Sequence, residues 1–298
     1  MSTTHSNRSF IAHYLFRAAL LGGYAFLIVF LNSNGDLSLF VAPRTEQAVK
    51  LSALGLYAAA AYQAYSAFRM WRDSHQEQCG CDHDHGPSRS LLRNTLIYAL
   101  FLLPLLLGFL MPHEPLNSTL AAKKGMSFSG LQSAASSDSL SAGTQEGKLS
   151  LDQLFATDEY TSSYANFGKK LYQQPRIVVD DALFIETLTT LDLFQSNFVG
   201  KTVSLTGFVY RDREMNDEQF AVSRFVMSCC SADAMPYGLM VHSKQAAVYK
   251  NDAWVTLTGV ATTATFQNNK ILMLEATSIT PVPAPADTYA YPNYDFDL

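Results

Sequence analysis

The chain has 298 residues, of which 48% are hydrophobic and 16% charged, and its formal net charge is −5. A typical soluble domain has about a quarter of its residues charged, and the deficit lies in residues 1–111, which hold 8 Lys and Arg against 6 Asp and Glu, whereas the remainder holds 13 against 20. This acidic remainder lacks the basic face that nucleic-acid binding requires, which excludes that class of function.

Three apolar stretches within residues 1–111 predict transmembrane helices, at residues 10–31, 51–68 and 94–111. The first is long enough to cross a hydrocarbon core of about 30 Å at about 1.5 Å per residue. A cleaved signal peptide is the alternative for the first stretch, but no small-residue cleavage site follows it. A helix lying in the membrane interface is the alternative for the second, which is richer in Ala and Tyr.

Basic residues in the short loops set the expected orientation. Residues 69–93 contain four arginines and the N-terminal segment has Arg8 and Arg17, whereas the loop between the first two stretches has only Arg44 and Lys50. We therefore expect a multi-pass membrane protein with a cytoplasmic N-terminus and an extracytoplasmic domain after residue 112.

The loop at residues 72–93 contains the sequence QCGCDHDHG and, with it, two of the four cysteines of the chain. Cytoplasmic thiols stay reduced, so these cysteines are better read as metal ligands than as a disulfide. Sulfur and imidazole donors suit zinc, copper(I) or nickel, and a solvated polar loop is the alternative. The candidate ligands are His75, Cys79, Cys81, Asp82, His83, Asp84 and His85.

Beyond the membrane stretches the chain divides into three parts. Residues 112–150 are rich in Ser, Gly and Ala and are expected to be a flexible linker. Residues 151–281 are expected to form a β domain, and the Pro- and Tyr-rich residues 282–298 a disordered tail. No phosphate-binding loop, dinucleotide fingerprint or G-x-S-x-G motif occurs in this soluble part, and we expect a non-enzymatic function.

The β domain begins with a short strand at residues 175–181 and an amphipathic helix at residues 182–200. Alternating apolar residues then predict five strands, at residues 201–212, 219–230, 237–243, 253–264 and 270–282. Mid-strand glycines are typical of bends in small barrels. The expected fold class is therefore α+β, with three transmembrane helices followed by a small OB-like β-barrel, and a β-sandwich is the alternative.

Two adjacent cysteines, Cys229 and Cys230, carry the chemistry of this domain, and Asp233 adds an oxygen donor. A disulfide between neighbours closes a strained ring, so the options are a buried thiol pair, a metal-ligand pair or a redox switch. Two small buried residues on a strand are the alternative. The nearby His242 is interpreted as a packing or surface residue.

Four motifs in this order resemble the YcgQ-like family of bacterial membrane permease subunits: CGCDHDHG, LPLLLGFLMP, LNSTLAAKKG, and GFVYRD followed by RFVMSCCSADAMPYGLMV. The resemblance extends over essentially the whole chain, apart from the tail beyond about residue 281. It implies a location in the bacterial inner membrane and a polytopic YcgR-like permease as partner, and it implies no established reaction.

The hypothesis that joins these observations is an accessory permease subunit that handles a transition metal, zinc first, with soft ligands on both sides of the membrane. In this hypothesis the loop collects metal, and Cys229, Cys230 and Asp233 accept it or contact the permease. The alternatives are an envelope thiol-redox protein and a purely structural permease partner.

Overall fold

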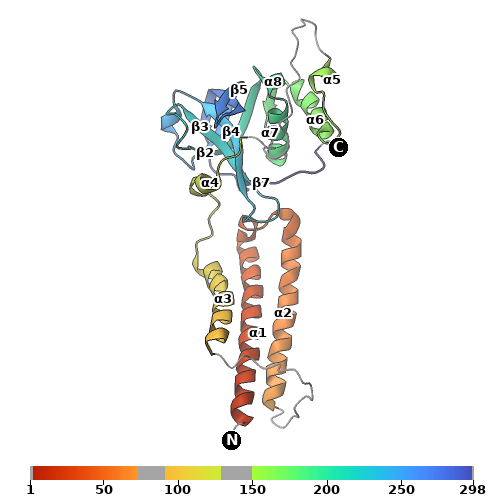
Figure 1. Cartoon of the computed structure of the whole chain (residues 1–298), viewed down its shortest axis with the longest axis vertical. Coiled ribbons are helices and arrows are strands. Elements are labelled where there is room, and N and C mark those ends of the chain that lie inside the picture. Colours follow the sequence, from red (N-terminus) through yellow and green to blue (C-terminus); the bar gives the residue numbers. More distant parts are fainter. Residues whose placement is uncertain (1–2, 73–90, 129–149, 297–298) are drawn as a thin grey trace. The chain divides into compact units, whose positions relative to one another are not determined.

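The computed structural model describes residues 3–72, 91–128 and 150–296. These residues form two compact units, Met1–Glu114 and Pro115–Leu298. The first is helical, and the second combines helices with one sheet, as Figure 1 shows for each unit. The α+β class expected from the sequence is confirmed.

Three long helices make up the helical unit: α1 (Thr3–Asn34), α2 (Pro43–Arg72) and α3 (Leu91–Leu110). Gly35, with a φ of 80°, ends α1 in the left-handed conformation that glycine adopts without strain. The 3-10 turn η1 (Asp36–Leu39) then leads into α2, which begins at Pro43, where the missing N–H of proline costs nothing. Pro104 lies inside α3.

Two of the three expected transmembrane helices are long and apolar enough to cross a membrane, judged by length and composition within the described residues: Phe10–Asn34 and Leu92–Leu110. Only 6% of each is buried, so neither resembles the core helix of a soluble protein. The remaining expected span, residues 51–68, is helical as part of α2, but α2 is not among these candidates. Three spans are therefore not confirmed, because alanines and polar residues dilute the hydropathy of α2.

A glycine at the helix contact and hydrogen bonds made by tyrosine side chains join α1 to α3. A Cβ added at Gly23 would lie 2.8 Å from the Leu105 side chain, so glycine permits the close approach of the two helices. Nδ1 of His13 lies 2.6 Å from the hydroxyl oxygen of Tyr98, and the Tyr24 hydroxyl donates to the Phe101 carbonyl at 2.6 Å. These polar contacts fix which faces of α1 and α3 meet.

The described part of the second unit contains the helices α4 (Ser118–Lys124), α5 (Leu151–Leu154), α6 (Ser162–Tyr172), α7 (Phe184–Leu193) and α8 (Gln195–Phe198). It also contains the 3-10 turns η2 (Asp181–Leu183) and η3 (Ala246–Val248). The strands are β1 (Arg176–Val178), β2 (Thr202–Tyr210), β3 (Gln219–Val226), β4 (Met235–His242), β5 (Trp254–Phe266), β6 (Asn269–Pro281) and β7 (Tyr289–Ala290).

The seven strands form one sheet in the order β1-β2-β5-β6-β4-β3-β7. β2 also pairs with β3 through Phe208–Tyr210, so the sheet curls, and a Cβ on Gly207 would meet the Ser223 carbonyl oxygen at 2.5 Å where these strands approach. It is nevertheless not the closed OB-like barrel expected. The β2–β3 and β4–β6 pairings are short, whereas β5 and β6 pair over most of their length, and β1 and β7 extend the sheet.

One hydrophobic core holds this unit together, and Figure 1 shows α6, α7 and α8 gathered beside the strands. Leu188 and Leu191 of α7 and Phe198 of α8 are at most 1% exposed. They pack in one cluster with apolar side chains from the inner face of the sheet. The expected helix at residues 182–200 corresponds to η2, α7 and α8.

Segments expected to be unstructured contain ordered elements. Strand β7 lies in the expected disordered tail and pairs in parallel with β3, with Tyr289 and Ala290 buried. Composition misled here because the tail gains its stability from tertiary contacts rather than from local preference. Likewise α4 lies in the expected linker, where the Ser118 hydroxyl and N–H both donate to the Asp252 carboxylate at 2.6 Å.

Candidate functional site

The expected metal ligands fall in two places along the chain. His75, Cys79, Cys81, Asp82, His83, Asp84 and His85 lie outside the described residues, and their role stays a prediction. Cys229, Cys230 and Asp233 lie within them, on the connection between β3 and β4. The strand expected to run to residue 230 ends at Val226, so both cysteines occupy a turn rather than a strand.

The turn brings the two thiols and the carboxylate together. Neither cysteine forms a disulfide in the described part of the chain, their sulfur atoms are 3.6 Å apart, Cys229 is exposed and Cys230 half-buried. Asp233 accepts hydrogen bonds from the backbone N–H groups of Cys229 at 2.7 Å and Ser228 at 3.2 Å. The interpretation as two buried strand residues is therefore wrong for Cys229.

The backbone of the turn is fixed from two directions. The Asp233 N–H donates to the Cys230 carbonyl at 3.1 Å, which closes the turn between the two residues. From α4, the Lys124 ammonium donates to the carbonyl of Ala232 at 3.0 Å and also to that of Ala234. The sulfur atoms are thus displayed on a backbone that does not depend on a disulfide.

The two cysteines differ in acidity. The hydrogen bond between the Cys229 thiol and Asp233, followed by the contact with Cys230, raises the pKa of Cys229 to about 12. The backbone N–H of Ala232, followed by the Cys229 thiol and the Asp233 N–H, lowers the pKa of Cys230. Burial opposes ionisation of Asp233, but the Cys229 thiol and backbone donors prevail and lower its pKa.

This arrangement pairs a protonated thiol with a sulfur disposed to ionise. The thiolate is the nucleophilic and metal-binding form of cysteine, so Cys230 is the more reactive of the two. Among the described residues, no group of three or more His, Cys, Asp and Glu side chains is placed to hold a metal ion. A metal ion on this turn would therefore complete its coordination shell with ligands from elsewhere.

Sequence reasoning missed a second polar cluster, centred on His242 at the end of β4. Its Nδ1 lies 2.7 Å from a carboxylate oxygen of Glu275, and its Nε2 lies 3.1 Å from one of Glu218. The hydrogen bonds that His242 donates to Glu275 and then to Glu218 raise the pKa of His242. His242 thus lies between two carboxylates, a pair of contacts that the sequence did not predict.

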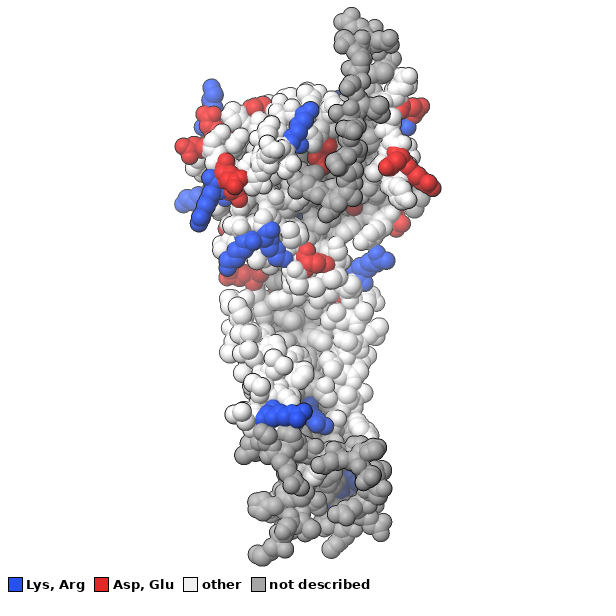
Figure 2. All heavy atoms as spheres, in the orientation of Figure 1, with Lys and Arg blue, Asp and Glu red and all other residues white. Residues whose placement is uncertain are grey.

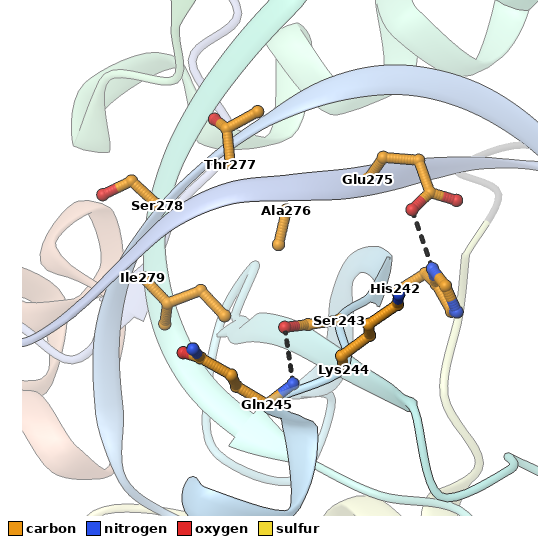
Figure 3. Close-up of a pocket in the computed structure, with 9 residues that line it drawn as sticks. All are labelled: His242, Ser243, Lys244, Gln245, Glu275, Ala276, Thr277, Ser278 and Ile279. Atoms are coloured by element: carbon orange, nitrogen blue, oxygen red, sulfur yellow. Dashed lines mark hydrogen bonds and ion pairs between the residues drawn. The ribbon is translucent and has the colours of Figure 1, made fainter.

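Strand register explains this cluster. His242 is paired with Gln219 of β3, beside Glu218, and with Glu275 of β6. It lines a cavity of about 360 Å³ together with Ser243, Lys244 and Gln245 and with residues 275–279, as Figure 3 shows. The two glutamates bind opposite nitrogens of the ring, so the cluster holds an imidazolium rather than presenting three ligands to one metal ion.

Comparisons with known proteins identify relatives of this chain. Residues 16–127 match the DUF1980 N-terminal domain and residues 154–292 match the DUF1980 C-terminal domain. The chain carries both DUF1980 domains. The first match begins in the helical unit and continues through α4 into the sheet-containing unit, and the second match lies wholly within the sheet-containing unit.

Two bacterial proteins align over most of the chain. One, from Bacillus subtilis (strain 168), bears the name "UPF0703 protein YcgQ" and is 27% identical over 286 residues, covering 93% of this chain and 99% of that protein. The other, from Streptococcus mutans serotype c, bears the name "Putative two-component membrane permease complex subunit" and is 28% identical over 193 residues, covering 63% of this chain and 70% of that protein. The resemblance to the YcgQ-like family is thereby confirmed.

Proposed function

We propose that this protein is an accessory subunit of a membrane permease complex, held in a bacterial inner membrane by α1 and α3. The observation that carries the proposal is the similarity to the Streptococcus mutans protein named as such a subunit. The two apolar helices support it, because their exposed leucines and phenylalanines need an apolar surrounding. The partner in this proposal is a polytopic YcgR-like permease.

The two units would divide the work. The helical unit offers apolar side chains that pack against transmembrane helices of the permease. The sheet-containing unit would lie outside the cytoplasm, as the basic residues of the loops predict, and would present the Cys229–Asp233 turn there. Nothing in this role requires the protein to catalyse a reaction.

The finer part of the proposal is that the complex handles a transition metal, with zinc as the best fit to thiolate and imidazole donors. Residues 75–85 supply such donors on the cytoplasmic side, and Cys230, helped by Cys229 and Asp233, supplies them on the other. A low-pKa thiolate is the form that binds a metal, which supports Cys230 as the first ligand on the turn.

A second candidate function is thiol redox chemistry in the cell envelope. The observation that favours it is the adjacent pair of thiols with unequal acidity, since oxidoreductase sites combine one ionised and one protonated cysteine. Reversible oxidation of the pair would favour this function over metal binding.

A purely structural role in the complex is the remaining alternative. Unchanged transport after replacement of both cysteines by serine would favour it.

Co-purification tests the permease proposal. The full chain with an N-terminal affinity tag is expressed with the YcgR-like permease, and the complex is purified in mild detergent. We expect the permease to co-elute in a fixed ratio with the wild-type chain. An unrelated polytopic membrane protein, expressed in place of the permease, is the control. Equal recovery of both membrane proteins, or of neither, would contradict the proposal.

Elemental analysis tests the metal proposal on protein purified under reducing conditions. The comparison is between the wild type, Cys79→Ser/Cys81→Ser, Cys229→Ser/Cys230→Ser and, as a matched control, His113→Gln. We expect bound zinc in the wild type and the control, and a loss in each cysteine variant. Absence of metal from all four proteins would favour the redox or structural role.

A further inference from the structure

A cavity of about 790 Å³ opens between α1, α2 and α3, in the half of the candidate span Phe10–Asn34 that lies nearer the N-terminus. This volume is in the range of small-molecule sites, about 300–1,000 Å³. All three helices contribute to it. It lies within the helical unit and is distinct from the Cys229–Asp233 turn and the His242 cluster.

One part of its lining is basic and polar. Arg17 and His13 come from α1, and Arg93 and Asn94 come from the start of α3. None of the described residues that line the cavity is Asp or Glu. Within the described part of the chain Arg17 makes no hydrogen bond or ion pair, whereas Arg93 has a contact of its own and further N–H donors to share. The lining therefore matches an anionic group.

A buried acceptor marks the same cavity. The side-chain oxygen Oε1 of Gln63, on α2, is buried and accepts no hydrogen bond from the described residues. An unpaired buried polar atom is unfavourable, and native proteins seldom leave one without a partner. A ligand in the cavity that donates an O–H group would satisfy it.

The remaining lining is apolar. Leu20, Leu21, Leu56, Ile97 and Phe101 line the cavity alongside the basic residues. A free inorganic anion would use the arginines and leave this apolar wall uncovered. A ligand with a charged head and a hydrocarbon chain would cover both parts.

We propose that this cavity binds an anionic phospholipid with a hydroxyl-bearing headgroup, of the phosphatidylglycerol class. The phosphate lies between Arg17 and Arg93, a headgroup hydroxyl donates to Oε1 of Gln63, and an acyl chain lies along Leu56 and Phe101. The inference rests on the proposed membrane location of α1 and α3. Charged residues inside a span face a cavity or a partner, and Arg17 fits this rule.

Native mass spectrometry of the full chain in neutral detergent tests the proposal. The probes are phosphatidylglycerol, phosphatidylcholine and phosphatidylmethanol with identical acyl chains, and glycerol 3-phosphate. We expect about tenfold tighter binding of phosphatidylglycerol than of phosphatidylcholine, and Arg17→Gln to weaken it about fivefold. Gln63→Leu should abolish the preference for phosphatidylglycerol over phosphatidylmethanol, which carries the same charge without hydroxyls. Arg44→Gln, outside the cavity, is the matched control.

Several outcomes would overturn the inference. Equal binding of phosphatidylglycerol and phosphatidylcholine would remove it, as would an Arg44→Gln effect as large as that of Arg17→Gln. Competition by glycerol 3-phosphate at lipid concentrations would show an anion site without a lipid. Should Arg17→Gln fail to fold, as judged by circular dichroism, the Gln63→Leu comparison decides.

Membrane location is measured separately by alkaline extraction of cell membranes. Release of the protein into the supernatant would contradict the membrane location and with it the proposed function. Retention in the membrane without lipid selectivity would contradict the lipid site alone.

Discussion

The two units of this chain expose opposite kinds of side chain. In Figure 2 the helical unit is white over the middle of its visible face, whereas the sheet-containing unit shows both signs of charge. Large apolar residues such as Leu100, 69% exposed, cover α3, while Leu191 of α7 is fully buried. The helical unit instead turns polar groups such as Gln63 inward. Each unit is thus matched to a different solvent.

The largest expected effect comes from the core of the sheet-containing unit. Leu191→Ala should lower the free energy of unfolding by about 2–5 kcal/mol, because it removes buried methyl groups and leaves a cavity. Leu100→Ala should change it by less than about 0.5 kcal/mol. Chemical denaturation of the full chain in detergent measures both. Equal effects of the two substitutions would show that the units do not differ in this way.

A buried charge sharpens the contrast. Arg224 of β3 is 1% exposed, donates to Asp181 at 2.6 Å and to the Asp287 carbonyl at 2.7 Å, and so joins the tail to the sheet. Arg224→Met should cost about 1–3 kcal/mol through these charge-assisted hydrogen bonds. Arg17→Gln, in the helical unit, should leave the unfolding free energy unchanged within about 0.5 kcal/mol. Denaturant titration with both variants tests this, and a neutral Arg224→Met would contradict it.

The next prediction concerns the reactivity of the two thiols. Within the described residues, cysteines occur only in the sheet-containing unit. Near neutral pH, brief alkylation should modify Cys230 at least about tenfold faster than Cys229, because the pKa of Cys230 is lowered and that of Cys229 raised to about 12. Fragment mass spectrometry assigns the modified sulfur.

Asp233→Asn provides the control for this prediction. It removes the carboxylate that raises the pKa of Cys229, so alkylation of Cys229 should accelerate. Faster modification of Cys229 than of Cys230 in the wild type would show that exposure, rather than ionisation, governs the turn.

The smallest expected effect is the pH dependence contributed by His242. Its folded-state pKa is raised above 6.5 by Glu275 and Glu218, so the stabilisation is complete below pH 6.5 and is lost as pH rises through the raised value. Because the pair is partly exposed, the effect is less than about 1 kcal/mol.

Thermal unfolding between about pH 5 and pH 8 measures the His242 contribution. His242→Gln should reduce the loss of stability with rising pH without abolishing it, since Asp36 and the Gly108 carbonyl also raise the pKa of His113. An unchanged slope in the variant would remove His242 from the account.

Local patterns in the sequence were enough to predict much of the fold. Patterns of apolar residues located β2, β5 and β6 to within a few residues, because each of these strands contributes buried side chains to the core. The apolar helices α1 and α3 were predicted from hydropathy. By contrast, β7 was missed because its stability depends on the distant partner β3, and the closed barrel was wrong because pairing lengths are set by tertiary contacts.

For the candidate sites, too, the sequence predicted the local features and missed those that depend on distant residues. Cys229, Cys230 and Asp233 were found because they are adjacent in sequence and chemically distinctive. Which thiol ionises depends on backbone N–H directions that composition does not encode. The ion pairs of His242 were not predicted because one carboxylate precedes β3 and the other lies in β6, 24 and 33 residues away in the sequence. Correct pairing of β3, β4 and β6 would have revealed them.

Strand β7 has a practical consequence for anyone who handles this protein. The pairs Phe225–Tyr289 and Val226–Ala290 and the hydrogen bond from the Met227 N–H to the Ala290 carbonyl, at 3.0 Å, brace β3 where it enters the thiol turn. We expect an affinity tag or fusion partner at the C-terminus to disturb these pairings. The reactivity of Cys230 would then change although no residue of the turn is altered. Purification handles therefore belong at the N-terminus.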